Sequence, residues 1–481
     1  MSDPRSFFWH DYETFGTRPA LDRAAQFAGI RTDLELNLIG DPVMVYCRPA
    51  NDFLPSPTAC LVTGISPQHA WEEGLPECDF IAAIEREMRV PGTCTLGYNN
   101  IRFDDEFTRH LLYRNFFDPY AREWRDGNSR WDLLDVVRIT RALRPEGLEW
   151  PVREDGTISN LLEDLTRVNG IEHGDAHDAL ADVHATIEIA KRIRQSQPRL
   201  YHYLIDNRGK KPAATLLNTR DRNMLVHTSG MFPNEICNTT LVMPICSHPR
   251  NTNGVLVFDL RVDPTGLIEA SPDDLRERIF SRREDLPNGS DRIPIKTVHS
   301  NRCPVLAPRS VLDAESAQRI DIDVDACHVH RERILQHIDS IVPKLEAAHS
   351  DPGFAPTDDP DLLLYGGDFF SSEDRRTMDD LRDLPPSSLA QHDQMFSDPR
   401  IPEMLFRYRA RNYLDTLDPG ERDEWVLFCK ERIHGMDETG ESAYTRFLKE
   451  IAQCRQDHPE RLAFLDCIEQ YAHDIATAAK P

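Results

Sequence analysis

The ten residues FFWHDYETFG, Phe7 to Gly16, constrain the fold and the chemistry of this chain more than any other stretch. The aromatic and apolar residues at its start predict a short buried strand. Asp11 and Glu13 come at its end, and side chains two positions apart on a strand point to the same face. Two such charges beside an apolar element are costly unless a cation neutralises them, and carboxylate oxygens suit Mg²⁺ or Mn²⁺. A solvated strand end has the same pattern, so a metal site needs further ligands from elsewhere in the chain.

The length and composition of the chain bound its class. With 481 residues it is too long for one hydrophobic core, and about two to four domains are expected. Its hydrophobic content of 40% and charged content of 28% are typical of a soluble globular protein. We see no apolar run that suits a signal peptide or a membrane span, and no C-x-x-C pair among the eleven cysteines. We therefore expect a cytoplasmic protein with reduced thiols and no membrane partner.

The charge balance alone argues against a nucleic-acid partner. The chain has 56 Lys and Arg against 81 Asp and Glu, a net charge of −25. A local basic groove on an acidic body remains compatible with that total, and arginines do recur between residues 102 and 144. Tyr120 and Trp124 lie among them, and a single-strand groove requires aromatic faces for bases and guanidinium groups for phosphates. Ordinary amphipathic helices would show the same pattern, so both interpretations stay open here.

The first two hundred residues predict an α/β layout. Strand patterns cover a stretch that begins at residue 7 and includes Asp11 and Glu13, and residues 26–33, 42–49 and 93–99. Helical patterns cover 79–89, a segment within 100–116 that has Asp104 in its first turn, 129–143, 161–168 and 179–194. Three strands in quick succession, then a helix, a strand and more helices predict a mixed sheet with helices packed on it.

The pattern of predicted secondary structure changes twice after the first two hundred residues. From residue 199 short β runs are punctuated by Pro and Gly, with one good helix at 271–280, which predicts a small β-barrel or sandwich. A Pro- and Asp-rich stretch at 350–361 is typical of a domain boundary, and the chain beyond it is nearly all helical. We expect domains at 1–198, 199–350 and 351–481.

The first domain supplies the ligands that the opening strand needs. Asp104 opens a predicted helix, and HDALAD offers His177 with Asp182 five residues later. Four carboxylates can hold two metal ions roughly 3.5–4 Å apart, and a histidine can deprotonate an attacking water. Two cysteine and histidine sets, near residues 237–248 and 327–330, lack a recognised zinc spacing, so we interpret them as ordinary residues.

The order D-x-E, Asp, His-x4-Asp resembles the DEDD exonuclease superfamily, histidine subtype, which has a ribonuclease H-like fold. Longer strings such as HDYETFG, GYNNIRFDDE, AHDALADV, VHTSGMF and YRARN resemble bacterial exonuclease I over essentially the whole chain. The resemblance implies a ribonuclease H-like mixed-sheet domain, an SH3-like β-barrel domain and an all-helical C-terminal domain. It also implies a monomer that hydrolyses single-stranded DNA processively from the 3′ end to nucleoside 5′-monophosphates. Its cofactor would be two Mg²⁺ ions, with Mn²⁺ as a substitute.

The resemblance assigns roles to individual residues. It implies His177 as the general base and four metal ligands, namely Asp11, Glu13, Asp104 and Asp182. Asp11 would bridge both ions, and Glu13 would also lie nearest the 3′-terminal nucleotide. Each assignment has a rival in a neighbouring residue, and the position within the family's strings selects against His173, Asp105 and Asp178.

The resemblance also implies contacts with the substrate and with a partner. The positions that match the family's single-strand contacts are Arg109, Tyr120, Trp124 and Arg138. Arg144 and Tyr203 match residues that bind the acidic tail of single-strand DNA-binding protein, although Tyr203 could equally be a core tyrosine. Leu161 departs from the family pattern, which usually has a basic residue there to hold the 3′-terminal nucleotide.

Two other functions fit parts of the sequence. A 3′–5′ exoribonuclease would use the same carboxylates, but such enzymes are usually single compact domains. An inactive single-strand DNA-binding scaffold would keep the fold, but it would have no use for a full set of metal ligands.

Overall fold

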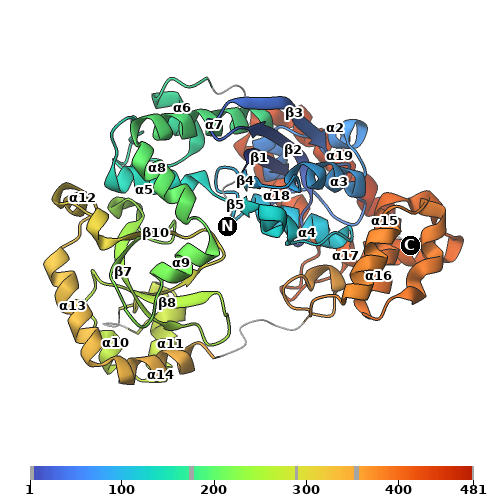
Figure 1. Ribbon diagram of the computed structural model, residues 1–481. Coiled ribbons are helices and arrows are strands. Elements are labelled where there is room, and N and C mark those ends of the chain that lie inside the picture. Colours follow the sequence, from blue (N-terminus) through green and yellow to red (C-terminus); the bar gives the residue numbers. More distant parts are fainter. Residues whose placement is uncertain (1–4, 173–177, 288–290, 351–356, 479–481) are drawn as a thin grey trace. The chain divides into compact units, whose positions relative to one another are not determined.

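The computed structural model describes residues 5–172, 178–287, 291–350 and 357–478 (Figure 1). Its chain divides into two compact units. The first-sheet unit contains residues 2–129, 173–184 and 355–481, and the second-sheet unit contains residues 130–172 and 185–354. Among the described residues, no helix combines the length and the apolarity that crossing a membrane requires.

The first sheet is mixed, as the sequence predicts. Its strands are β1 (Ser6–Thr14), β2 (Ala24–Thr32), β3 (Leu38–Tyr46), β4 (Thr93–Leu96) and β5 (Ser129–Arg130), in the order β3-β2-β1-β4-β5. Strand β1 pairs antiparallel with β2 and parallel with β4, so it lies in the centre. The predicted meander of three strands is confirmed, although β3 begins at Leu38, within the predicted turn.

Four helices follow within the same unit: α1 (Pro57–Thr63), α2 (Pro67–Glu73), α3 (Glu77–Met88) and α4 (Asp104–Arg114). Helices α3 and α4 contribute to one hydrophobic cluster with β1 and β2, whose members include Phe8, Phe27, Ile84 and Leu111. The prediction omitted α1 and α2, which are only seven residues long. Each nevertheless begins with a Ser-Pro pair in which the serine side chain caps the helix, a start signal visible in the sequence.

The helix predicted at 129–143 is wrong at its start. Residues 129 and 130 form β5, and helix α5 (Leu133–Leu143) begins only after Asp132. The Asp132 side chain accepts a hydrogen bond from the backbone N–H of Leu134, so this residue is the N-cap of the helix. The helical period of the apolar residues continued past the cap and hid the boundary.

The C-terminal helices share cores with the first sheet. They are α15 (Ser372–Arg382), α16 (Arg400–Asn412), α17 (Pro419–His434), α18 (Ala443–Asp457) and α19 (Leu462–Ala478). Phe15 and Phe53 lie in one cluster with residues of α18 and α19, and Tyr113 and Phe116 lie in another with residues of α15 and α16. The first 129 residues and the helical C-terminal segment therefore pack as one body.

Buried ion pairs reinforce that packing. Asp52, which is fully buried, accepts hydrogen bonds from Arg23 at 3.1 Å and from Arg411 of α16 at 2.8 and 3.1 Å. Arg411 also donates to the buried Asp361 at 2.6 Å. Burial by itself would raise the pKa of Asp52, but Arg411 and Arg23 outweigh it and hold that pKa far below its usual range.

The second-sheet unit contains an antiparallel sheet. Its strands are β6 (Leu225–Thr228), β7 (Thr239–Ser247), β8 (Gly254–Asp259), β9 (Ile295–His299) and β10 (Val305–Pro308), in the order β10-β6-β7-β8-β9. The short β runs are thus confirmed, as is the helix predicted at 271–280, which is α11 (Pro272–Phe280) with Ser271 as its N-cap.

The expectation of a single helix in this region is wrong. Six further helices lie in the described part of residues 198–350: α8 (Pro198–Asn207), α9 (Lys210–Leu216), α10 (Thr265–Glu269), α12 (Ala314–Arg319), α13 (Val324–Gln336) and α14 (Ile338–Ala348). The unit also includes α5 and the helices predicted at 161–168 and 179–194, which are α6 (Leu162–Val168) and α7 (Ala179–Ser196, which starts in the other unit). Helices α10, α11 and α13 each contact α14, which packs against β7 (Figure 1). Asp313 and Asp323 cap α12 and α13, so these helix starts are encoded locally.

Candidate metal centre and strand-binding residues

Three carboxylates meet at the end of β1. Asp11 and Glu13 project from one face of the strand, and Asp182 comes from the first turn of α7. One ligand oxygen from each residue lies within 4.8 Å of the other two. Glu13 is buried, whereas Asp11 and Asp182 are partly exposed, so the group is open on one side.

A fourth carboxylate lies beside this group without belonging to it. Asp104 is the first residue of α4, and its Oδ1 accepts a hydrogen bond of 3.0 Å from the backbone N–H of Tyr12. Tyr12 lies between Asp11 and Glu13 on β1. The backbone of the strand therefore fixes Asp104 next to the two acids.

The repulsion among these acids is visible in their titration. The pKa of Glu13 is raised to about 9, first by burial and then by the charges of Asp182, Asp104 and Asp178. The pKa of Asp11 lies well above its usual range for the same reasons, with burial again the largest cause. A divalent cation would reverse both effects, since it stabilises the ionised carboxylates.

The donor set fits a hard cation. All of its ligand atoms are carboxylate oxygens, which Mg²⁺ and Mn²⁺ prefer, whereas protein zinc sites usually include nitrogen or sulfur. Asp11, Glu13 and Asp182 would hold the ion, with Asp104 alongside.

The rival residues differ in their surroundings. Asp105 is fully buried and forms an ion pair of 2.8 Å with Arg122. Asp178 contributes to the field at Glu13, but the group of three ligands includes Asp182. His177 and its rival His173 lie outside the described residues.

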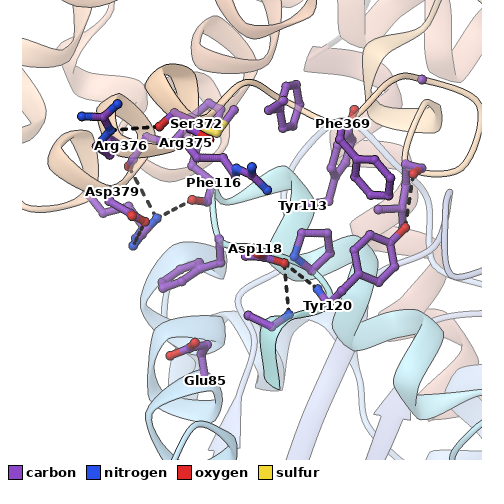
Figure 2. Close-up of a pocket in the computed structure, with 18 of the residues that line it drawn as sticks. Glu85, Tyr113, Phe116, Asp118, Tyr120, Phe369, Ser372, Arg375, Arg376 and Asp379 are labelled. Carbon is purple, nitrogen blue, oxygen red and sulfur yellow. Dashed lines mark hydrogen bonds and ion pairs between the residues drawn. The ribbon is translucent and has the colours of Figure 1, made fainter. Parts of the chain in front are cut away.

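A cavity of about 830 Å³ in the first-sheet unit combines aromatic and basic side chains (Figure 2). Tyr120 and Trp124 line it together with Phe369, Arg375 and Arg376 from the helical segment. The rings of Tyr120 and Phe369 meet edge to face, with centroids 6.2 Å apart. Trp124 is 63% exposed, and Arg125 lies over its ring. The sequence analysis missed Phe369, Arg375 and Arg376, although FFSSEDRR joins an aromatic pair to a basic pair as Tyr120 and Trp124 join neighbouring arginines.

Arg109 is less open than a phosphate contact requires. Its side chain is buried and donates to Glu123 at 2.7 and 3.0 Å and to Glu106 at 2.7 Å. It also lies 5.6 Å from the ring centroid of Tyr120. In this arrangement Arg109 supports the wall of the cavity.

Comparison with known proteins covers the whole chain. Three family models match: "Exonuclease" at residues 8–190, "Exonuclease I SH3-like domain" at 208–351 and "Exonuclease I C-terminal domain" at 358–475. Exodeoxyribonuclease I of Escherichia coli is 46% identical over 477 residues, which cover 98% of each chain. An exonuclease I structure from Methylocaldum szegediense has a TM-score of 0.92 at 48% identity, covering 98% of this chain and 99% of that one.

The chain belongs to the exodeoxyribonuclease I family. Its predicted membership of this family is confirmed, and so is its identification as an exodeoxyribonuclease. The fold class is confirmed as an exonuclease domain with a mixed sheet, an SH3-like domain and a helical C-terminal domain. The predicted boundaries at 198 and 350 stay predictions.

Three solved structures describe what members of this family bind, and the first two are from E. coli. One is a complex with a dA16 oligonucleotide, at 44% identity and a TM-score of 0.93, covering 98% of this chain and 99% of that one. Another is a zinc-bound complex with single-stranded DNA, also at 44% and 0.93, covering 98% and 100%. The third is described as SSB/Exonuclease I with the inhibitor CFAM, at 43% and 0.89, covering 98% and 100%.

The remaining predicted contacts of this exodeoxyribonuclease I family member lie in the second-sheet unit. Arg138 pairs with Asp135 at 2.7 Å, and its guanidinium group lies 2.9 Å from where a side chain at Gly230 would begin. Arg144 pairs with Asp313 at 3.1 Å, and Tyr203 donates its hydroxyl hydrogen to the carbonyl of Leu306 at 3.1 Å. Leu161, where the family pattern has a basic residue, is 48% exposed.

The raised pKa of Glu13 predicts a pH-dependent metal affinity. In the metal-free protein Glu13 keeps its proton up to pH of about 9, whereas in the unfolded chain its pKa has the ordinary value of 4.5. Folding without metal therefore takes up a proton between these values, so stability from this group falls as pH rises through them. Because a cation must displace the proton, we expect Mg²⁺ to bind more tightly at pH 9 than at pH 7, with proton release. Isothermal titration calorimetry in two buffers of different ionisation enthalpy measures both quantities, and equal affinities without proton release would contradict the prediction.

Proposed function

We propose that the protein hydrolyses single-stranded DNA from its 3′ end, in a metal-dependent reaction that releases nucleoside 5′-monophosphates. The carboxylate group of Asp11, Glu13 and Asp182 carries the proposal, because its oxygens are close enough for a shared divalent cation. The E. coli relative in complex with dA16 supports a single-stranded DNA substrate. The zinc-bound E. coli complex supports a divalent metal at the site.

The cofactor in this proposal is Mg²⁺, bound as two ions, with Mn²⁺ as a substitute. Asp11, Glu13, Asp104 and Asp182 would hold these ions. When bound, the ions neutralise charge on the phosphodiester and on the attacking and leaving oxygens. His177 removes the proton from the attacking water, and Glu13 lies nearest the 3′-terminal nucleotide.

The single strand binds through aromatic and basic groups outside the metal site. We assign this role to Tyr120 and Trp124 in the cavity, where bases can stack, and to Arg138. Arg109 belongs to the same set, and its pairing with Glu123 and its place over the Tyr120 ring indicate that it acts by holding that ring. Processive degradation and a role in DNA repair and recombination follow from the family.

The partner in this proposal is the acidic C-terminal tail of single-strand DNA-binding protein. The SSB/Exonuclease I structure of a relative supports such a partner. Arg144 offers the tail a partly exposed guanidinium group, and Tyr203 offers a partly exposed ring. We further propose a cytoplasmic monomer with domains at 1–198, 199–350 and 351–481.

A comparison of substrates tests the function. Purified protein is mixed with end-labelled single-stranded DNA, duplex DNA or RNA, in Mg²⁺ or in EDTA. We expect mononucleotides from single-stranded DNA in Mg²⁺ only, with much slower release from duplex DNA and RNA. Release from RNA but not from DNA would instead favour the exoribonuclease. Binding of single-stranded DNA without release from any substrate in Mg²⁺ would favour the inactive scaffold.

A further inference from the structure

Three side chains form a row across the first sheet at the level of the metal site. Glu13 on β1 is paired with Gln26 on β2, and Gln26 is paired with Tyr46 on β3. Residues directly opposite each other in antiparallel strands point to the same face, so Gln26 and Tyr46 share the face of Glu13 and Asp11. The row starts at one metal ligand and runs away from β4.

Gln26 has a buried oxygen without a protein partner. Only 2% of the residue is exposed, and its Oε1 accepts no hydrogen bond from the described residues. Buried polar atoms are nearly always bonded, so an unpaired amide oxygen beside a carboxylate cluster requires an explanation. When a cation is bound, the neighbouring carboxylates are ionised and only accept hydrogen bonds, so none of them can then be the partner of this oxygen.

Tyr46 lies opposite Gln26 on the neighbouring strand, on the side away from Glu13. Burial raises the pKa of the Tyr46 hydroxyl, as does the charge of Asp178, while a hydrogen bond from the Gln26 side chain opposes the rise. A hydrogen bond that favours the phenolate must donate to it, and the amide nitrogen is the only donor of this side chain. With its nitrogen directed at Tyr46, the amide leaves Oε1 on the side away from the Tyr46 hydroxyl. The Gln26 side chain itself lies opposite Glu13 on the same face of the sheet. Tyr46 is itself packed edge to face against His69, with ring centroids 4.9 Å apart.

We propose that Gln26 is a further oxygen donor of the cation site, acting through Oε1 together with Asp11, Glu13 and Asp182. Tyr46 is a positioning residue that fixes the orientation of the amide. This inference rests on the proposed function, since it assumes that the carboxylate group binds a divalent cation. An amide oxygen suits that role because hard cations accept carbonyl as well as carboxylate oxygens. It also adds no negative charge to a site where neighbouring carboxylates already raise the pKa values of Asp11 and Glu13.

Binding of Mn²⁺ without DNA tests the inference directly. The unbound ion is measured by electron paramagnetic resonance at pH 8 for the full chain and for Gln26→Leu. We expect the substitution to raise the dissociation constant about tenfold or more, the range for loss of a supporting contact at a metal site. Tyr46→Phe should raise it by a smaller factor, because the amide remains but can rotate.

Gln68→Leu is the matched control. Gln68 on α2 also has a buried Oε1 without a partner among the described residues, and its Nε2 donates to the carbonyl of Cys467 at 2.6 Å. It has no place in the row with Glu13. We expect this variant to bind Mn²⁺ as the unchanged protein does.

The remaining outcomes separate the inference from the proposed function. Circular dichroism checks each fold, and Gln26→Asn, which keeps the amide but withdraws it by one methylene, replaces Gln26→Leu if that variant does not fold. Unchanged affinity in a folded Gln26 variant, or equal losses in the Gln26 and Gln68 variants, would overturn the inference and leave the nuclease function intact. Weaker Mn²⁺ binding by a Gln26 variant would support it even if no DNA were hydrolysed. Failure of the unchanged protein to bind Mn²⁺ would overturn both.

Discussion

Replacement of Asp182 by alanine should abolish hydrolysis of single-stranded DNA while DNA binding in EDTA stays largely intact. The Asp182 carboxylate is one of three whose oxygens lie within 4.8 Å of one another, so its loss opens the cation site. A bound cation supplies several kcal/mol of charge stabilisation in the transition state, and a loss of ~4 kcal/mol lowers the rate roughly 10³-fold. Binding in EDTA should persist, because stacking and phosphate contacts do not need the metal.

The same helix provides the control for this experiment. Glu188 lies on α7, is exposed and pairs with Lys191 at 2.6 Å, so Glu188→Gln also removes one negative charge from that helix. We expect this variant to hydrolyse DNA at the normal rate. Rates come from single-turnover release of mononucleotides in Mg²⁺, and affinities come from fluorescence anisotropy in EDTA. Loss of binding in EDTA together with loss of activity would instead make Asp182 a structural residue.

Replacement of Arg411 by methionine should cause the largest loss of stability in the first-sheet unit. Arg411 donates hydrogen bonds to Asp52 and Asp361, which are both buried. Its removal leaves two buried carboxylates with fewer partners, and breaking a buried ion pair costs about 3–5 kcal/mol. We expect the free energy of unfolding to fall by about that amount, as measured by urea denaturation at pH 7.

The loss of stability in Arg411→Met should also depend on pH. Arg411 holds the pKa values of Asp52 and Asp361 far below the unfolded value. The stability they contribute is present above the unfolded pKa of about 4 and is lost as pH falls through the folded values. The difference in the free energy of unfolding between Arg411→Met and the unchanged protein should therefore become smaller below pH of about 4. Arg422→Met on α17 is the control, because it removes an exposed arginine, and it should change the free energy of unfolding by less than ~0.5 kcal/mol. An equal loss of stability in both variants would contradict the role of the buried ion pairs.

The sequence predicted those parts of the fold that depend on local periodicity. The run of aromatic and apolar residues located β1, the two-residue spacing put Asp11 and Glu13 on one face, and Asp104 lies in the first turn of its helix as expected. Helices of seven residues, such as α1, are too short to show a clear period, and a two-residue strand such as β5 shows none.

The parts that could not be predicted depend on register and on distant contacts. Gln26 lies opposite Glu13 because of the pairing between β1 and β2, and a single sequence does not specify which residues face each other across strands. Likewise, Tyr120 meets Phe369 across almost 250 residues of chain. The resemblance to a family located the candidate ligands and strand contacts, whereas only the structure relates Gln26 to Glu13 and Phe369 to Tyr120.

The shared cores of the first-sheet unit determine when this protein can finish folding as it is synthesised. Phe15 and Ala25 belong to the same hydrophobic cluster as Ile468 and Ala472 of α19. This core therefore cannot be completed until the last helix has been synthesised. At roughly 5–20 residues per second, about 350 residues separate β5 from the end of α19, which is a delay of roughly 20–70 s. During that time the apolar side chains of the first sheet lack their C-terminal cover, while the second-sheet unit can already complete its own core. The order of assembly on the ribosome is thus inside-out: the middle of the chain folds first, and its two ends close together last.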